Sequence, residues 1–342
     1  MMDCVYLREE TKEKTPDDRI IHHCLIHGSC TKSGKSHPVA SCTDCRKSLT
    51  LNQNLSGFLD HLTMLDRTGK SNSSLRNLLA GRPSFLVCGG PSAKDLPLEN
   101  LTRRGIWSLA VNNMAGMIPV SSFICSDPPS KFHNGIWLDP NVMKFVPTPK
   151  MRGCRGRLRE KVGAEFRQLR LGGKDVSVED CPNIWGFERR SWLLPDATFF
   201  TETSAAWGNH QSGVNRTGLS KTVCTMLLGL RILYYLGSRR IYLVGVDFNM
   251  KSGVGLKDNY AFGEKRDASA VASNNDQYRI VNGWLQTLQT DGVFQKFGLE
   301  IFNCNPASGL RAFAHVPFRL AIQDTIKDYP SEPFDLEAWY EK

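Results

Sequence analysis

A turn of two glycines, a proline and a serine has a composition that suits a bound phosphate. The turn consists of Gly89, Gly90, Pro91 and Ser92, and it follows a short β-prone run at 85–88. The glycines let the backbone turn sharply and approach a ligand closely. Ser92 and Asp95 form a capping-box pattern that predicts a helix start, where free N–H groups favour a phosphate. Neither standard nucleotide fingerprint matches, so a tight turn without a ligand is the alternative.

Polar residues also follow three later strand-like runs. The runs and the residues after them are 106–111 with Asn112 and Asn113, 122–126 with Asp127, and 240–246 with Asp247. An asparagine amide can read a base or ribose edge, and an aspartate can bind a sugar hydroxyl, hold a metal or accept a proton. Both residue types are also common in turns, which is the structural alternative. Asp127 has no acidic residue two positions on, so the need for a catalytic divalent metal stays open.

The elements around these residues predict an α/β fold. Short apolar runs alternate with helical patterns, such as the long apolar pattern at 217–235, and this order predicts a mostly parallel sheet with helices on both faces. Ligands of such sheets bind at the carboxyl ends of the strands. The polar residues that follow the strands are therefore expected to meet at one edge of the sheet.

Composition and length fit a soluble protein with one large body. The chain has 342 residues, 41% of them hydrophobic and 23% charged, and it has no apolar run long enough for a transmembrane helix. The polar N-terminal stretch shows no secretory signal, and a cytoplasmic location is expected. The expected divisions are a cysteine module at 1–48, a linker with one helix at 49–80, the α/β body at 81–330 and a tail at 331–342.

Four cysteines near the N-terminus have a spacing that suits structural zinc. Cys24, Cys30, Cys42 and Cys45 form the pattern C-x5-C-x11-C-x2-C, with His27 in the first gap. A Cys-x-x-Cys pair places two thiolates on one turn, as tetrahedral Zn²⁺ requires. The four cysteines are the expected ligands, and His27 is an alternative to Cys24. Free thiols on an unstructured arm, or a redox pair at the last two cysteines, are the other interpretations.

Positive charge is concentrated between residues 144 and 174 and predicts a polyanionic partner. This stretch holds ten basic residues against two acidic ones, in a chain of net charge +9. The residues expected to contact DNA are Lys150, Arg152, Arg155, Arg157 and Arg159. A solvated surface segment is the alternative.

The motifs of the body resemble, in kind and order, those of bacterial sialyltransferases of the lipooligosaccharide type. The matching segments are 87–92, Asn112, 212–214, 241–248, 260–262 and 305–308. The resemblance implies a Rossmann-like variant of the glycosyltransferase fold that works without a metal. It implies that a donor nucleotide is held by Gly90, Ser92, Asn112, Ser212, Gly213, Tyr260 and Ser308. Pterin-pyrophosphokinase-like proteins share the Gly-Pro-Ser turn.

Two other segments resemble phage proteins. The cysteine module resembles one found in phage and bacterial glycosyltransferase-like proteins, and the stretch at 126–140 resembles phage glycosyltransferases that modify 5-hydroxymethylpyrimidines in DNA. This resemblance implies a double-stranded DNA acceptor with hydroxymethylated bases, 5-hydroxymethylcytosine first among them. It implies a nucleotide-sugar donor, with UDP-sugars favoured, and the cytoplasm of an infected bacterium as the location.

Transfer to a hydroxymethyl group requires a base that removes the proton as the oxygen attacks the anomeric carbon. Asp127 and Asp247 are the first candidates because they follow strands of one sheet, and Asp276 and His315 are the reserves. For His315 a packed or capping histidine is the alternative.

Aromatic residues between 184 and 207 are candidates for contact with a base that leaves the duplex. They are Trp185, Phe187, Trp192, Phe199, Phe200 and Trp207, with Arg189 and Arg190 beside them. Aromatic and arginine side chains can stack on such a base, and a place in the core is the alternative.

Three other functions fit the same residues. They are a sialyltransferase-like enzyme acting on a surface glycan, a pyrophosphokinase acting on a small alcohol, and a non-catalytic nucleic-acid-binding protein.

Overall fold

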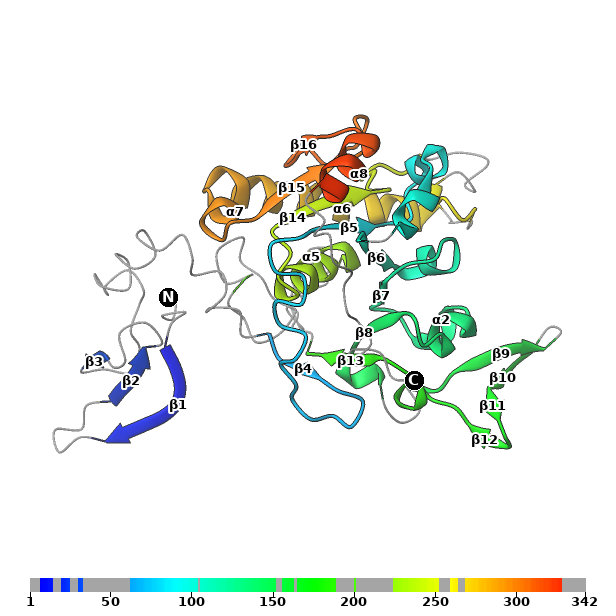
Figure 1. Cartoon of the computed structure of the whole chain (residues 1–342), viewed down its shortest axis with the longest axis horizontal. Helices are drawn as coiled ribbons and strands as arrows, with labels where there is room; N and C mark the ends of the chain where they lie inside the picture. Colours follow the sequence, from blue (N-terminus) through cyan, green and yellow to red (C-terminus); the bar gives the residue numbers. More distant parts are fainter. Residues whose placement is uncertain are drawn as a thin grey trace.

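The computed structural model describes residues 62–103, 105–151, 156–162, 165–188, 200, 224–251, 259–263 and 268–327. It also describes the backbone of three strands nearer the N-terminus. A sheet of nine strands organises the described residues of the body (Figure 1). The strands are β4 (Met64–Leu65), β5 (Pro83–Val87), β6 (Trp107–Val111), β7 (Ser122–Ile124), β8 (Met143–Pro147), β13 (Ile184–Phe187), β14 (Arg240–Val244), β15 (Glu300–Asn303) and β16 (Ala314–His315).

The sheet is mostly parallel, and its strand order runs outward from β5 in two directions. The order is β16-β15-β14-β5-β6-β7-β8-β13-β4, and among these pairs the one between β13 and β4 is antiparallel. The chain moves from β5 through β6, β7 and β8 to β13, and then returns to place β14 on the other side of β5. This doubly wound arrangement confirms the predicted α/β class with a mostly parallel sheet.

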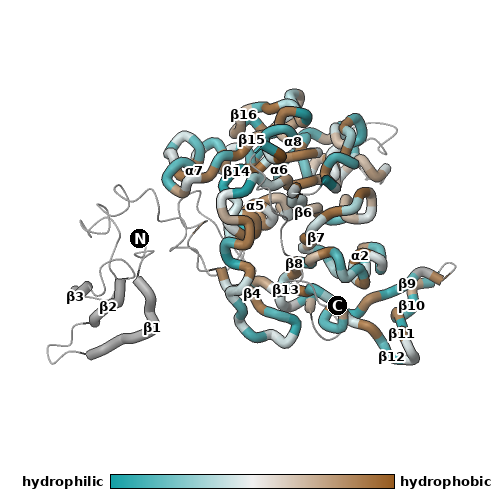
Figure 2. The backbone as a smooth tube through the Cα atoms, in the orientation of Figure 1, coloured by the Kyte–Doolittle hydropathy of each residue, from teal (hydrophilic) through white to brown (hydrophobic). Residues whose placement is uncertain are grey.

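Helices and apolar residues cover both faces of the sheet. The helices are α2 (Asn134–Leu138), α5 (Thr225–Tyr235), α6 (Ala268–Thr290), α7 (Val293–Lys296) and α8 (Phe318–Lys327). Every residue of α5 is buried, and Figure 2 shows this helix mostly in hydrophobic colours. The larger core, which we call the main core, contains Leu86 of β5 and residues of α5, α6 and α7. Another core contains Phe85 and Val87 of β5 with residues of α8. Because side chains alternate between the faces of a strand, the two cores lie on opposite faces of β5. Among the described residues, every helix is too short or too polar to span a bilayer.

The helix expected after β5 is a pair of 3-10 turns, η3 (Pro91–Asp95) and η4 (Leu98–Thr102). The capping box expected of Ser92 and Asp95 does not form, and Gly90 takes the N-cap position without a side-chain bond. The Ser92 hydroxyl instead donates to the Asp247 carboxylate, which lies 155 residues further along the chain. A tertiary partner has therefore replaced the local one.

The segment expected as a linker contributes to the body. Met64 and Leu65 form β4, which pairs with β13 at the edge of the sheet. Leu62, Leu75 and Leu79 are buried in the main core. The α/β body thus includes residues from Leu62 onward, because these leucines pack against partners that are distant in sequence.

Two antiparallel ribbons lie in the second half of the basic stretch. They are formed by β9 (Arg159–Val162) with β10 (Glu165–Gln168), and by β11 (Arg170–Leu171) with β12 (Lys174–Asp175). We call residues 159–175 the arm, because Figure 1 shows these ribbons extending beyond the sheet at its β8–β13 end.

Three N-terminal strands form a small antiparallel sheet. They are β1 (Leu7–Lys14), β2 (Ile20–Cys24) and β3 (Cys30–Lys32). Cys24 ends β2 and Cys30 begins β3, while His27, Cys42, Cys45 and the tail at 331–342 lie outside the described residues. The zinc site therefore stays a prediction.

Candidate functional site

A cavity of about 330 Å³ lies at the carboxyl ends of β5, β6 and β14. β5 and β14 are neighbours, but the chain leaves them toward opposite sides of the sheet. The cavity thus lies where the strand order changes direction, which is where doubly wound sheets bind ligands. We call this space the switch cavity. It is lined by the turn at Gly89–Pro91, by the turn at Gly245–Met250, and by residues of α5 and α6.

Two close backbone approaches explain the glycines beside the switch cavity. The Gly90 N–H donates to the Gly245 carbonyl oxygen at 2.8 Å. A Cβ on Gly90 would lie 2.5 Å from that oxygen and 2.7 Å from Cγ of Asp247, so a larger residue does not fit without movement. Gly245 has a φ of +64° and lies against the carbonyl of Cys88. The two turns are therefore packed backbone to backbone.

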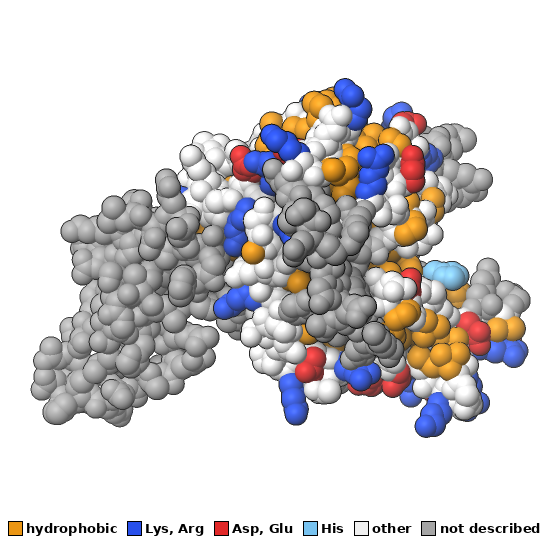
Figure 3. Space-filling view, viewed as in Figure 1, with side chains coloured by type: hydrophobic (Ala, Val, Ile, Leu, Met, Phe, Trp, Pro, Cys, Tyr) orange, Lys and Arg blue, Asp and Glu red, His pale blue; other side chains and the backbone are white. Residues whose placement is uncertain are grey.

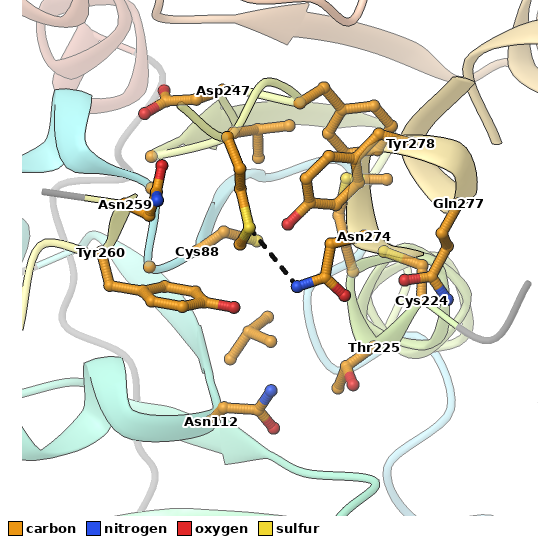
Figure 4. Close-up of a pocket in the computed structure, with 18 of the residues that line it drawn as sticks. Cys88, Asn112, Cys224, Thr225, Asp247, Asn259, Tyr260, Asn274, Gln277 and Tyr278 are labelled. Atoms are coloured by element: carbon orange, nitrogen blue, oxygen red, sulfur yellow. Dashed lines mark hydrogen bonds between the residues drawn. The ribbon is translucent and has the colours of Figure 1, made fainter. Parts of the chain in front are cut away.

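The Asp247 carboxylate joins three turns that follow strands. Its Oδ2 accepts a 2.9 Å hydrogen bond from the Ser92 N–H, and its Oδ1 accepts bonds from the Ser92 hydroxyl and, at 2.6 Å, from Nδ2 of Asn305. Figure 4 shows the side chain turned away from the centre of the cavity. Both carboxylate oxygens thus have donors in the protein, and this arrangement positions the walls of the cavity.

Ser308 holds the turn after β14 through hydrogen bonds. It is buried, and its hydroxyl donates to the Val246 carbonyl at 2.6 Å and accepts from the Leu310 N–H at 3.0 Å. Neither Ser308 nor Ser92 lines the switch cavity. The structure places both residues, which the sequence assigned to donor binding, where they hold the turns that do line it.

Asn112 lines the switch cavity in a strained backbone conformation. It begins η5 (Asn112–Gly116) directly after β6 with a φ of +55°, in the left-handed region that asparagine tolerates better than most residues. Its Oδ1 is buried and has no hydrogen-bond partner among the described residues. Figure 4 shows its amide at the cavity opposite Tyr278. A buried acceptor without a partner calls for an explanation, and a ligand donor supplies one.

The deeper walls of the switch cavity carry neutral polar groups. Burial raises the pKa of the Cys88 thiol and of the Tyr278 hydroxyl well above their ordinary values, and it raises the pKa of the Cys224 thiol to about 11. These groups are therefore protonated near neutral pH. Tyr278 stacks on Phe248 with ring centres 4.7 Å apart, and Tyr260 stacks on Phe262 at 4.8 Å. Aromatic faces, amides and hydroxyls of this kind suit a base and a sugar.

A second cavity of about 620 Å³ adjoins the first. We call it the arm cavity, because Arg159 and Phe166 of the arm line it together with Lys131 and Phe132. Asn112, Asp127, Tyr260 and Phe262 line both cavities. These shared residues form the wall between the two spaces.

Asp127 is a carboxylate in this shared wall. It follows β7, and 48% of its side chain is exposed. Lys131 lies in the next turn, η6 (Pro129–Lys131), and its Nζ is 3.2 Å from Oδ2 of Asp127. The adjacent Ser126 hydroxyl bonds Thr225 at the start of α5 at 2.7 Å, which fixes the end of β7 against that helix. Asp127 therefore presents an accessible carboxylate to both cavities.

The other candidate bases lie elsewhere. Asp276 is on the exposed side of α6, with its carboxylate 3.6 Å from Arg279. His315 is exposed on β16, at the edge of the sheet. Neither residue lines either cavity.

The remaining candidates divide between the two cavities and the structure around them. Gly89, Gly90, Pro91, Asn112 and Tyr260 line the switch cavity, and Asn113 lines the arm cavity. Of the residues expected to contact DNA, Arg159 lines the arm cavity, Arg157 is exposed, and Lys150 donates to the Ser126 carbonyl. Ser212, Gly213, Arg152 and Arg155 lie outside the described residues.

Burial answers two questions that the sequence left open. Trp185, Phe187 and Phe200 belong to the main core, so the core interpretation holds for these three aromatics. Lys144, counted in the basic stretch, is buried, and its Nζ donates to the carbonyls of Asp139 and, at 2.9 Å, Pro182.

The sequence did not point to the part of the site contributed by α6, or to Phe166 of the arm. Asn274, Gln277 and Tyr278 line the switch cavity from α6, and Phe166 lines the arm cavity. The signal for α6 was a polar stripe, Asn-Asn-Asp-Gln, within an otherwise amphipathic helix. The described residues contain no group of three His, Cys, Asp or Glu side chains placed to hold a metal ion.

Comparison with known proteins adds little to this geometry. No protein-family model matches the chain, and no curated protein matches it. A solved structure that resembles it is the sialyltransferase CstII from Campylobacter jejuni in complex with a substrate analogue, CMP-3FNeuAc. The TM-score is 0.32 and the identity 12%, over 70% of this chain and 88% of that chain. At this TM-score the likeness decides neither fold nor function.

Proposed function

We propose that this protein is a glycosyltransferase that moves a sugar from a nucleotide-sugar donor to an acceptor hydroxyl. The observation that carries the proposal is the position of Asp127, a half-exposed carboxylate in the wall shared by two adjoining cavities. A group transfer between two substrates needs two neighbouring sites with a proton acceptor between them. The switch cavity and the arm cavity have that relationship.

The donor occupies the switch cavity in this proposal. The crevice between β5 and β14 is the place where doubly wound sheets hold nucleotides. Oδ1 of Asn112 accepts a hydrogen bond from a ribose hydroxyl or an exocyclic amine, which satisfies the buried acceptor. The neutral Tyr278 hydroxyl and the Asn274 amide face the same space (Figure 4). UDP-sugars are the first donors to test.

The acceptor hydroxyl enters from the arm cavity. Its oxygen attacks the anomeric carbon and forms the new glycosidic bond, while the bond from that carbon to the phosphate oxygen breaks and the nucleotide leaves with the electron pair. The hydroxyl proton passes to the Asp127 carboxylate, and Lys131 at 3.2 Å orients that carboxylate. Asp247 acts as a positioning residue, because Ser92 and Asn305 occupy its oxygens.

The acceptor in this proposal is a hydroxymethylated pyrimidine in DNA, with 5-hydroxymethylcytosine first. Arg159 and Lys131 at the arm cavity support a polyanionic acceptor, as does the net charge of +9. The second cavity is large enough for one nucleotide out of the duplex, which such an enzyme requires.

The test is mass spectrometry of nucleosides after incubation with modified DNA. The full chain is incubated with 5-hydroxymethylcytosine or 5-hydroxymethyluracil DNA and with UDP-, CMP- and GDP-sugars. The expected result is a sugar-sized mass gain on the modified nucleoside with one class of donor. If sugar were transferred to a glycan and not to DNA, the acceptor would be a surface polysaccharide. If the protein released AMP from ATP in the presence of a small alcohol, it would be a pyrophosphokinase and the proposal would be wrong.

Two matched variants test the catalytic assignment. Asp127→Asn is expected to lower turnover by at least about 100-fold, as removal of a general base does, while the protein stays folded. Asp276→Asn makes the same change on an exposed residue outside both cavities and is expected to keep full turnover. Equal turnover in the two variants would overturn the role of Asp127.

A further inference from the structure

The ribbon of β9 and β10 sorts its charged residues by face. The register pairs Phe166 with Lys161 and Gln168 with Arg159. Side chains of residues paired in an antiparallel ribbon lie on the same face, and the face alternates along each strand. Arg159, Phe166 and Gln168 therefore share one face, which we call the cavity face, because Arg159 and Phe166 line the arm cavity.

The acidic residues of this ribbon fall on the opposite face. Glu165 pairs with Val162 and Arg167 pairs with Glu160, and we call this set the outer face. There Arg167 is neutralised by Glu165, with Nη2 and Oε2 3.2 Å apart. Glu160 and Glu165 thus lie on the face away from the cavity, while Arg159 lies on the face toward it. The ribbon therefore presents positive charge to the arm cavity.

Phe166 gives the cavity face an exposed aromatic ring. Phe166 is 62% exposed, whereas most phenylalanines of the described residues are buried in the cores. Figure 3 shows hydrophobic side chains beside lysine and arginine at the lower right, where the arm lies. An exposed aromatic next to cations is the combination that binds single-stranded nucleic acid, because bases stack on the ring and phosphates contact the cations.

We propose that the cavity face of the arm binds an unpaired nucleotide, with its base stacked on Phe166 and its phosphates near Arg159 and Lys131. The alternation of residues along β9 and β10 carries this inference, together with the place of both residues in the lining of one cavity. This inference deepens the proposed function, because it names the element that selects the acceptor. It rests on the proposed function for the reaction that the bound nucleotide undergoes. Paired bases do not expose a face to the ring, so an unpaired strand is the preferred form.

Equilibrium binding of a fluorescein-labelled single-stranded oligonucleotide to the full chain tests the inference. Phe166→Ala is expected to weaken binding roughly tenfold, the loss of one stacked base, and Phe166→Tyr is expected to retain it. Arg159→Gln is expected to weaken binding and to lower the salt slope by about 0.7, the value for one phosphate contact on a single strand. A blunt duplex of the same sequence is expected to bind more weakly than the single strand.

The outer face provides matched controls. Arg167→Gln removes the same charge as Arg159→Gln from the same ribbon, and Val162→Ala trims an apolar side chain that is 45% exposed. Both controls are expected to change affinity by less than about twofold, because outer-face residues do not line the cavity. Equal losses in Arg167→Gln and Arg159→Gln, or full affinity in Phe166→Ala, would overturn the inference. If heparin displaced the oligonucleotide and the Phe166→Ala variant bound heparin as tightly as the wild type, the face would instead be assigned to an acidic polysaccharide.

Hydrolysis of the nucleotide sugar by the wild-type protein without DNA separates this inference from the proposed function. A protein that hydrolyses a nucleotide sugar but binds oligonucleotides independently of Phe166 overturns the inference alone. A protein that binds the oligonucleotide through Phe166 but neither hydrolyses nor transfers from any nucleotide sugar overturns the proposed function alone.

Discussion

The main-chain N–H of Ser92 lies 2.9 Å from Oδ2 of Asp247, and this hydrogen bond ties the turn after β5 to the turn after β14. The two strands form the crevice in which the switch cavity lies. Residues of both turns line that cavity, and the hydrogen bond fixes their spacing. The Asp247 carboxylate therefore sets the width of the proposed donor site.

Replacing Asp247 by Asn is expected to cost stability as well as activity. The carboxylate accepts the Ser92 N–H on one oxygen and the Ser92 hydroxyl and Asn305 amide on the other, whereas an amide turns a donating NH2 group toward one of these two sets of donors. The loss of a charged hydrogen-bond partner lowers the free energy of unfolding by about 2 kcal/mol. Urea unfolding measures this change, and Asp127→Asn serves as the comparison because Asp127 is half-exposed. A stable Asp247→Asn protein without turnover would indicate a chemical role for Asp247.

Adding a methyl group at Gly90 is expected to close the junction of the two turns. The Cβ would lie 2.5 Å from a backbone oxygen, which has no rotamer to change, so Gly90→Ala is expected to lose about 1–3 kcal/mol of stability and to bind donor more weakly. Gly283→Ala is the control, since nothing lies within 4 Å of its Cβ and it occupies the exposed side of α6. Alanine there is expected to stabilise the protein by up to about 1 kcal/mol. Thermal shift with and without a UDP-sugar measures both effects.

Stability is expected to fall in acid partly through Asp324. Burial opposes its ionisation, but hydrogen bonds from Tyr242 and Arg240 outweigh this and hold the pKa of the carboxyl below 3.8. Because the pKa is lower in the folded state than in the unfolded state, the contribution is full above about pH 5 and is lost as the pH falls through the folded pKa. The stability difference between wild type and Asp324→Asn is therefore expected to shrink from pH 7 to pH 3. A difference that does not change with pH would contradict this assignment.

Cys224 is expected to resist alkylation at neutral pH. Burial raises the pKa of its thiol to about 11, so only a small fraction is thiolate at pH 8, and the thiolate is the reactive form. Cys88 lines the same cavity, and burial raises the pKa of its thiol well above the ordinary value. Peptide mapping after iodoacetamide treatment is expected to show both cysteines largely unmodified at pH 8 in the folded protein, and modified after unfolding. Rapid labelling of Cys224 at pH 7 would show that the cavity holds it as a thiolate.

The apolar runs of the chain were enough to locate the strands that hold the site. The runs before Gly89, Asn112, Asp127 and Asp247 form β5, β6, β7 and β14, and these four residues line one cavity. This prediction was possible because parallel strands buried on both faces are nearly continuous apolar segments, and because their carboxyl ends share an edge.

The arm and the role of Ser92 could not be predicted in the same way. Most residues in the strands of the arm are charged, as in Arg-Glu-Lys-Val of β9, and these strands have little core to pack against, so the sequence shows charge rather than strand periodicity. Ser92 has a plausible local partner in Asp95, yet its hydroxyl bonds a residue 155 positions away. Local patterns do not contain the information that decides between such partners. The same holds for β4, whose two residues pair with β13 after a long intervening stretch of chain.

The hydrogen bonds at Asp247 also predict which amides become exposed together when the protein unfolds locally. The Asp247 carboxylate accepts the N–H of Ser92, and its main-chain oxygen accepts the N–H of Gly309 at 2.7 Å. Each amide hydrogen exchanges only when its bond to Asp247 opens, although the two amides are far apart in the chain. Their amide hydrogens are therefore expected to exchange with deuterium at a common rate, as members of one cooperative unit. A bound donor nucleotide would slow both together.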